Sequence, residues 1–190
     1  DFERGSYEGV WPTGWAFGER PSVVGQWDAA SNSPQLARPG VANSATRTLR
    51  EQGVLRSSSF TLTHRHLLYR LKGQDAQIRL YIDNYFMDVY NGLLFGGCSS
   101  RVDNRPTWGW LVQGGDVSRY VGHRVYFEVL DMGDGFTALD EVRLSDSGPP
   151  PDDENAIGFR VVADTLNATN AGAGGPDADP AEPLARGFAK

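Results

Sequence analysis

The stretch "DMGDGFTALDEVRL", residues 131–144, decides the fold of this chain. Its first part is a glycine-rich turn, and its second part alternates apolar and polar residues, which is typical of a β-strand. In a regular strand one face would carry Phe136, Ala138, Asp140, Val142 and Leu144. Four of these five side chains are apolar, so this face is predicted to point into a core. Asp140 would then place a carboxylate in that core.

The rest of the chain before residue 148 shows the same β pattern. Runs with alternation or β-rich composition occur at 11–17, 57–63, 66–71, 77–83, 108–112, 124–131 and 136–145. Gly, Asn, Asp and Pro separate these runs, and no long amphipathic helical pattern competes with them. The sequence therefore predicts an all-β fold, an antiparallel β-sandwich of jelly-roll type, with residues 132–135 as a hairpin connection.

Composition divides the chain near residue 148. Six of the eleven prolines but only two of the 21 aromatic residues lie beyond residue 147, so little of a core can lie there. We expect one β-sandwich domain over 1–147 and a linker or tail over 148–190. Within the tail, residues 155–168 have helical spacing, and 159–163 alternate as in a short strand; both interpretations stay open.

Charge and apolar runs limit the classes of partner. The net charge of −6 argues against nucleic acid, because nucleic-acid binding needs a basic face. No apolar run approaches the roughly 18 to 20 residues that cross a bilayer, so membrane insertion is not expected. One cysteine, Cys98, allows no internal disulfide. The first residues lack signal-peptide character, and without an initiator Met we expect a segment of a longer protein.

A carboxylate at position 140 requires a partner, since an unpaired one in an apolar interior costs roughly several kcal/mol. One interpretation is an ion pair with an arginine, hydrogen bonds to backbone amides, or a position at the rim of the core. Another starts from Asp1 and Glu3, which alternate around Phe2 and could form a terminal strand beside the last strand. Two or three carboxylates brought together there would repel unless a cation such as calcium lay among them.

An exposed aromatic and polar surface is the candidate binding site. With Ile78, Leu80 and Ile82 in the core, the intervening residues of that strand face outward, and the indoles at 108 and 110 share one side. Sugars stack on such rings and bond to planar polar side chains. The candidate sugar-binding residues are Arg79, Tyr81, Asp83, Tyr85, Arg101, Asp103, Asn104, Trp108 and Trp110. Alternatively, one of the two tryptophans is a core residue, and Arg79 and Asp83 belong to a solvated sheet face.

Two longer stretches carry a family resemblance. They are "QIRLYIDNYFMDVYNGLLFGGCSSRVDN" (77–104) and "WGWLVQGGDVSRYVGHRVYFEVLDMGDGFTALDEVRLSDSGPPP" (108–151). With the opening "DFERGSYEGVWPTGWAFGERPS" (1–22), they resemble the β-sandwich module of large exported planctomycete proteins that also carry cytochrome c-type domains. Residues 116–122 and 139–146 also resemble motifs of jelly-roll carbohydrate-binding modules. Residues 21–59 match only loosely.

This resemblance implies a non-catalytic jelly roll that binds polysaccharide or oligosaccharide within an extracellular or periplasmic protein. It also implies structural calcium held by Glu3, Asp1 and Asp140. A docking domain that contacts its own protein's neighbours is the alternative function. A glycoside hydrolase is less favoured, because Asp140 and Glu141 are adjacent and point to opposite faces of a regular strand, whereas such enzymes use paired carboxylates.

Overall fold

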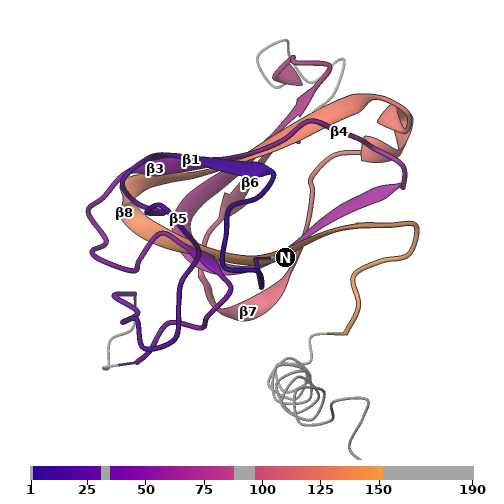
Figure 1. The fold of residues 1–190 in the computed structure, drawn as a ribbon. Coiled ribbons are helices and arrows are strands. Elements are labelled where there is room, and N and C mark those ends of the chain that lie inside the picture. Colours follow the sequence, from indigo (N-terminus) through magenta and orange to yellow (C-terminus); the bar gives the residue numbers. More distant parts are fainter. Residues whose placement is uncertain (1, 31–34, 88–96, 152–190) are drawn as a thin grey trace, which may run out of the picture. The chain divides into compact units, whose positions relative to one another are not determined.

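The domain is an all-β, antiparallel structure, as the sequence predicts (Figure 1). The computed structural model describes residues 2–30, 35–87 and 97–151. Residues Asp1–Asp152 form one compact unit. The two interpretations of the tail, at 155–168 and 159–163, lie outside the described residues, and the domain boundary at 147/148 stays a prediction.

Eight strands and a short 3₁₀ helix are described. Their bounds are β1 (Val10–Gly14), β2 (Ala42–Asn43), β3 (Gly53–Ser57), β4 (Phe60–Thr61), β5 (His66–Ile82), β6 (Ser99–Val102), β7 (Arg105–Val112), η2 (Val117–Tyr120) and β8 (Arg124–Ser145). Hydrogen-bond pairing joins all eight strands into one sheet. The all-β class is therefore confirmed, whereas a sandwich of two separate sheets stays a prediction.

Two long strands, β5 and β8, form the centre of the sheet. They pair antiparallel from His66↔Ser145 at one end to Ile82↔Val125 at the other. β6 and β7 pair with the free edge of β5, whereas β2, β3 and β4 pair with the free edge of β8. β1 extends the sheet beyond β3. Each half of the central pair thus has its own flanking strands.

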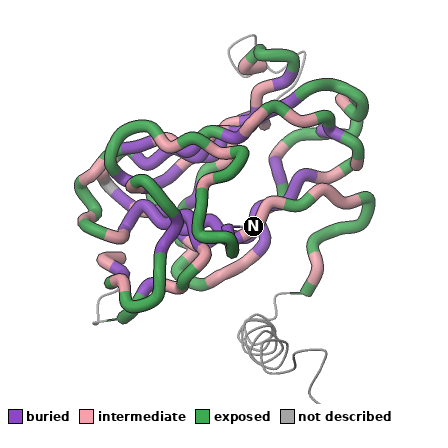
Figure 2. The backbone as a smooth tube through the Cα atoms, in the orientation of Figure 1, coloured by how far each residue is buried: buried purple, intermediate pink, exposed green. Residues whose placement is uncertain are grey.

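The sheet curls so that one face encloses the core. Figure 1 shows β8 curving back on itself, and Figure 2 shows buried stretches along the central strands. The pairing bulges where residues 132–135 of β8 lie opposite the single residue Asp75 of β5, whose φ is 53°, and the set of β5 side chains that face inward changes there. The buried core residues of β5 are odd-numbered before the bulge and even-numbered after it: Leu67, Tyr69 and Leu71, then Ala76, Ile78, Leu80 and Ile82. One bulge therefore keeps both halves facing the same core.

A second bulge, in β8, corrects the predicted orientation of its side chains. Arg70 of β5 pairs with Glu141 and Leu71 pairs with Leu139, so Asp140 is the extra residue. The extra residue reverses the alternation. As a result Val142 packs against the inner core, whereas Asp140 shares the outer side with Arg70, its ion-pair partner. The single face predicted for residues 136–144 is thus wrong.

Two further predictions of local structure are wrong. Residues 132–135 do not form a hairpin, because β8 continues through them and both of its halves pair with β5 in the same direction. The described residues at the amino terminus, Phe2 to Gly5, form a turn in which the Gly5 amide donates to the Phe2 carbonyl oxygen at 3.0 Å. The first strand begins only at Val10, so no terminal strand places Glu3 beside β8.

The curl depends on glycine at the bend. A Cβ atom added at Gly135 would overlap the carbonyl oxygen of Gln74, and one at Gly73 would lie 2.7 Å from the carbonyl oxygen of Phe136. Both obstacles are backbone atoms of the neighbouring central strand. The two strands can therefore approach each other at the bend only because these residues have no side chain.

Candidate functional site

The nine predicted sugar-binding residues do not form one site. Arg79 and Tyr81 lie on the outer side of the later half of β5, while Trp108 and Trp110 lie on β7, which pairs with the earlier half. The others lie in or beside β6 and the turn after β5: Asp83, Tyr85, Arg101, Asp103 and Asn104. Arg101 forms an exposed ion pair with Asp103 at 3.9 Å. The structure thus divides the predicted set among separate places.

The paired indoles of β7 share a side, but their rings already contact cations. Trp110 is buried, and the Arg143 guanidinium lies 5.3 Å from its ring centroid. Trp108 is half-buried, with Arg38 at 5.7 Å and Lys72 at 5.8 Å from its ring. These cation–π contacts leave little free ring face for a sugar.

Asp83 stabilises a turn. Its carboxylate lies 2.6 Å from Nδ1 of His123 and accepts a hydrogen bond from the Arg124 backbone N–H at 3.3 Å. The hydrogen bond from His123 lowers the pKa of Asp83, and the bond from Arg124 adds to this. Asp83 and Asn84 both have positive φ, of 49° and 68°. The carboxylate therefore fastens the end of β5 to the start of β8, beside the exposed Tyr85.

Asp140 belongs to a buried cluster of opposite charges. Its Oδ2 lies 3.6 Å from Nε of Arg70, and both side chains are buried. Burial raises the pKa of Asp140, while Arg38 and Arg70 oppose that rise and Glu3 adds to it. The ion pair with an arginine is one of the partners predicted from the sequence.

These surroundings do not fit a calcium ion. Two guanidinium groups act on Asp140, whereas calcium requires several oxygen ligands and is repelled by cations. The described residues contain no group of three His, Cys, Asp or Glu side chains arranged to hold a metal. Asp1 lies outside the described residues, so calcium itself stays a prediction.

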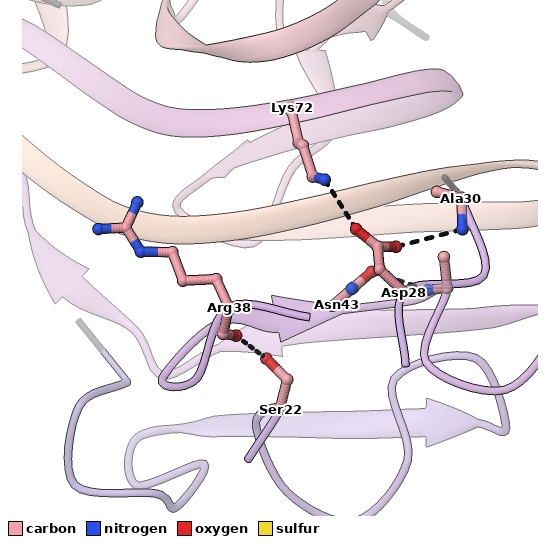
Figure 3. Close-up of polar contacts among 7 residues, drawn as sticks. Ser22, Asp28, Ala30, Arg38, Asn43 and Lys72 are labelled. Atoms are coloured by element: carbon pink, nitrogen blue, oxygen red, sulfur yellow. Dashed lines mark hydrogen bonds and ion pairs between the residues drawn. The ribbon is translucent and has the colours of Figure 1, made fainter. Parts of the chain in front are cut away.

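A second, partly buried ion pair holds the segment at 22–30 on this side of the sheet, and a hydrogen bond joins that segment to the one at 35–45 (Figure 3). Nζ of Lys72 donates to Oδ2 of Asp28 at 2.8 Å, and Oδ1 of Asp28 accepts from the Ala30 backbone N–H at 3.1 Å. The Ser22 hydroxyl donates to the Arg38 carbonyl oxygen at 2.5 Å. We call these two segments the cover, because Asp28 pairs with Lys72 of β5 and the Arg38 guanidinium interacts electrostatically with Arg70 and Asp140 on the outer side.

The outer side of the sheet has a different surface at the later half of β5, where side chains of β3, β8 and the turn after β5 join those of β5. We call it the aromatic ladder, and its members are Arg56, Tyr126, Tyr81, Phe86 and Arg79. The Tyr81 and Tyr126 rings are stacked, with centroids 4.5 Å apart and planes at 9°. The Arg56 guanidinium lies 4.0 Å from the Tyr126 centroid, and the Tyr81 hydroxyl donates to Glu128 at 2.9 Å. Because the rings face one another, a ligand meets mainly their edges.

A hollow beside Trp15 has the properties that the paired indoles lack. The indole is 72% exposed, and no described residue stacks a ring or cation on it. The hollow has a volume of about 510 Å³, within the range of small-molecule sites. Its lining includes these aromatic and polar residues: Trp15, Phe17, Glu19, Arg20, Gln26, Thr46 and Arg47. We call it the Trp15 hollow.

The backbone fixes the direction of this indole. The N–H groups of Trp15 and Ala16 both donate to the Gln52 carbonyl oxygen, at 2.9 and 3.3 Å. Ala16 and Phe17 are buried, so the chain is anchored immediately after Trp15. The indole is thus presented to solvent from a held turn. Sequence analysis missed this residue because it placed 11–17 in one strand, and only Gly14, with φ of 77°, hinted at a turn.

Comparisons with known proteins give little further information. No protein-family profile and no curated protein matches the chain. Among solved structures, the chain is similar to the cleaved K3 adhesin domain of Lys-gingipain from Porphyromonas gingivalis w83. The identity is 13% over 76% of this chain and 95% of that one, with a TM-score of 0.37, which is too low to assign a function. Within the described residues, no helix is long and apolar enough to span a membrane.

Proposed function

We propose that this domain is a non-catalytic carbohydrate-binding module whose ligand lies in the Trp15 hollow. The observation that carries the proposal is a held, exposed indole beside a hollow with planar polar side chains. An indole offers an apolar face to a sugar ring, and guanidinium and amide groups can bond to pairs of hydroxyls. Oε1 of Gln26 already accepts from the Val23 backbone N–H at 3.1 Å, which orients its amide.

The number of carboxylates in the hollow favours binding of a sugar over hydrolysis. The described lining contains a single carboxylate, Glu19. Hydrolysis of a glycosidic bond generally uses two carboxyl groups, one on each side of the bond. The proposal therefore places the sugar on the indole with Glu19 as a hydrogen-bond acceptor.

Native gels containing soluble xylan, laminarin or galactomannan test this site. We expect at least one polysaccharide to retard the chain, and Trp15→Ala to weaken that interaction about tenfold or more, which corresponds to about 1.4 kcal/mol. Trp11→Ala is the matched control, because Trp11 is also more than half exposed but does not line the hollow. Retardation by none of the polysaccharides, or equal retardation of the Trp15→Ala variant, would overturn the proposal.

Docking against another protein is the second candidate, and a separate surface favours it. Trp27 and Leu36 are paired across a β-bridge and are 61% and 59% exposed, and nearby Val24 is 84% exposed. Exposed apolar side chains grouped in this way are typical of interaction sites. Trp27→Ala would weaken docking to a neighbouring domain of the parent protein and leave retardation by polysaccharide unchanged.

The resemblance adds three proposals about the wider protein. They are export from the cell, attachment of a large bacterial protein to a polysaccharide, and calcium as a structural ion. Thermal unfolding measured with and without a chelator tests the last one. If calcium is bound, the chelator should lower the temperature of unfolding measured without polysaccharide. Since the Asp140 cluster already contains two arginines, such a shift would indicate another group of calcium ligands.

A further inference from the structure

A second hollow, at the bend of the sheet, differs from the Trp15 hollow in its chemistry. It has a volume of about 370 Å³, enough for a small polar ligand. Gly73 and Gly135, which allow the central strands to approach each other, form part of its lining. The polar lining residues are Gln35, Lys72, Gln74, Asn104 and Arg105. Among these described side chains two are cations, three carry amides, and none is a carboxylate.

One of the two cations has an unbalanced charge among the described residues. Lys72 is paired with Asp28 at 2.8 Å, so its charge is already matched. Arg105 pairs with no described carboxylate, and it donates only a long hydrogen bond, 3.5 Å, to the Trp110 carbonyl oxygen. Asp103, two residues earlier in the chain, pairs instead with Arg101. The described lining of the hollow therefore has an excess positive charge in a protein whose net charge is −6.

The amides specify the rest of the ligand. Gln74 and Asn104 are exposed and lie on either side of the bend, where each can donate and accept hydrogen bonds. A guanidinium bonds to a carboxylate through two parallel N–H groups, and amides suit neighbouring hydroxyls. A single unpaired cation matches one carboxylate, whereas a doubly charged phosphate would leave charge unbalanced.

We propose that this hollow binds a sugar that bears a carboxylate, with Arg105 on the carboxylate and the amides of Gln74 and Asn104 on its hydroxyls. The site is separate from the Trp15 hollow and does not depend on the proposed function there. It would give the domain selectivity for uronic acids.

Calorimetric titration with trigalacturonate and with its methyl ester tests the proposal. We expect the acid to bind at least tenfold more tightly than the ester, which has the same ring but no charge. Arg105→Gln should remove that difference. Arg65→Gln is the matched control, because Arg65 is exposed and lies outside the lining. Trp15→Ala should leave the titration unchanged, which separates this site from the proposed function.

A second variant guards against misfolding of the first. Gln74→Glu changes an exposed side chain and places a negative charge at the hollow, so it should weaken acid binding while leaving thermal unfolding unchanged. No binding of trigalacturonate, equal binding of acid and ester, or unchanged binding by the Arg105→Gln and Gln74→Glu variants would overturn the proposal.

Discussion

Each half of β5 has an arginine on its outer side, and the two arginines differ in how far they are buried. Arg70, in the earlier half, has a side chain 7% exposed beneath the cover and is paired with buried Asp140. Arg79, in the later half, is half-buried, donates to Gln77 at 3.0 Å and lies 5.6 Å from the Phe86 ring. A buried arginine such as Arg70 depends on its partner for stability, whereas a half-buried arginine of the aromatic ladder can exchange its partner for water.

Matched substitutions in the two halves should show the largest difference. Arg70→Met keeps much of the side-chain volume but leaves Asp140 buried beside fewer cations, so we expect a loss of about 3 kcal/mol in the free energy of unfolding. Arg79→Met should cost less than about 1 kcal/mol. Urea denaturation of both variants measures the difference. Equal losses would mean that the cover does not exclude water from the Arg70–Asp140 pair.

The bend between the halves gives the next largest effect. Gly135→Ala places a methyl group against the carbonyl oxygen of Gln74, so β5 and β8 must separate there, at a cost of about 2 kcal/mol. Gly148→Ala is the control, because nothing lies within 4 Å of its added Cβ. Denaturation midpoints compare them. A Gly135→Ala variant as stable as the control would show that the bend has room to adjust.

The stacked tyrosines of the ladder should contribute less than the buried pair. Tyr81→Leu and Tyr126→Leu, singly and together, form a double-mutant cycle whose coupling energy we expect to be about 1 kcal/mol. The stacked geometry, 4.5 Å between centroids, is the physical reason. A coupling energy near zero would mean that each ring is stabilised by its arginine or carboxylate neighbour instead.

Much of the fold could be predicted from the sequence, because alternation identifies strands well. Six of the seven predicted runs overlap described strands by several residues, and Ile78, Leu80 and Ile82 are in the core as expected. The continuity of β5 and of β8 could not be predicted. The sequence around Asp75 and Gly135 is typical of turns between strands. In the structure the chain bends at both places, and β5 and β8 pair with each other on either side of the bend. A bulge and a turn have the same local sequence signal.

The candidate site could be predicted in kind but not in place. The proposed Trp15 hollow contains the residue types that the sequence suggested, an exposed indole and planar polar groups, yet exposure depends on what covers each strand. Trp108 and Trp110 lie near the cover and beside arginines from distant parts of the chain, so their spacing alone could not reveal the contacts. Trp15 stands out only once buried Ala16 and Phe17 are seen to anchor the turn.

The smallest effect is a pH dependence that distinguishes Asp140 from the exposed acids. Burial raises the pKa of Asp140 above its ordinary value of 3.8, so the folded chain favours the protonated form. The carboxylate therefore lowers stability at neutral pH, and this loss disappears as the pH falls through the raised pKa. Asp83 and Asp116 have lowered pKa values, so their stabilising contributions are lost as the pH falls through those values.

Comparison with Asp140→Asn isolates the buried carboxylate, because both chains keep the exposed acids. Between about pH 7 and about pH 4, the free energy of unfolding of the natural chain should rise relative to that of the variant. Urea denaturation at several pH values measures this difference. A change of the opposite sign would mean that Arg38 and Arg70 outweigh burial, in which case the cover would hold a strong ion pair.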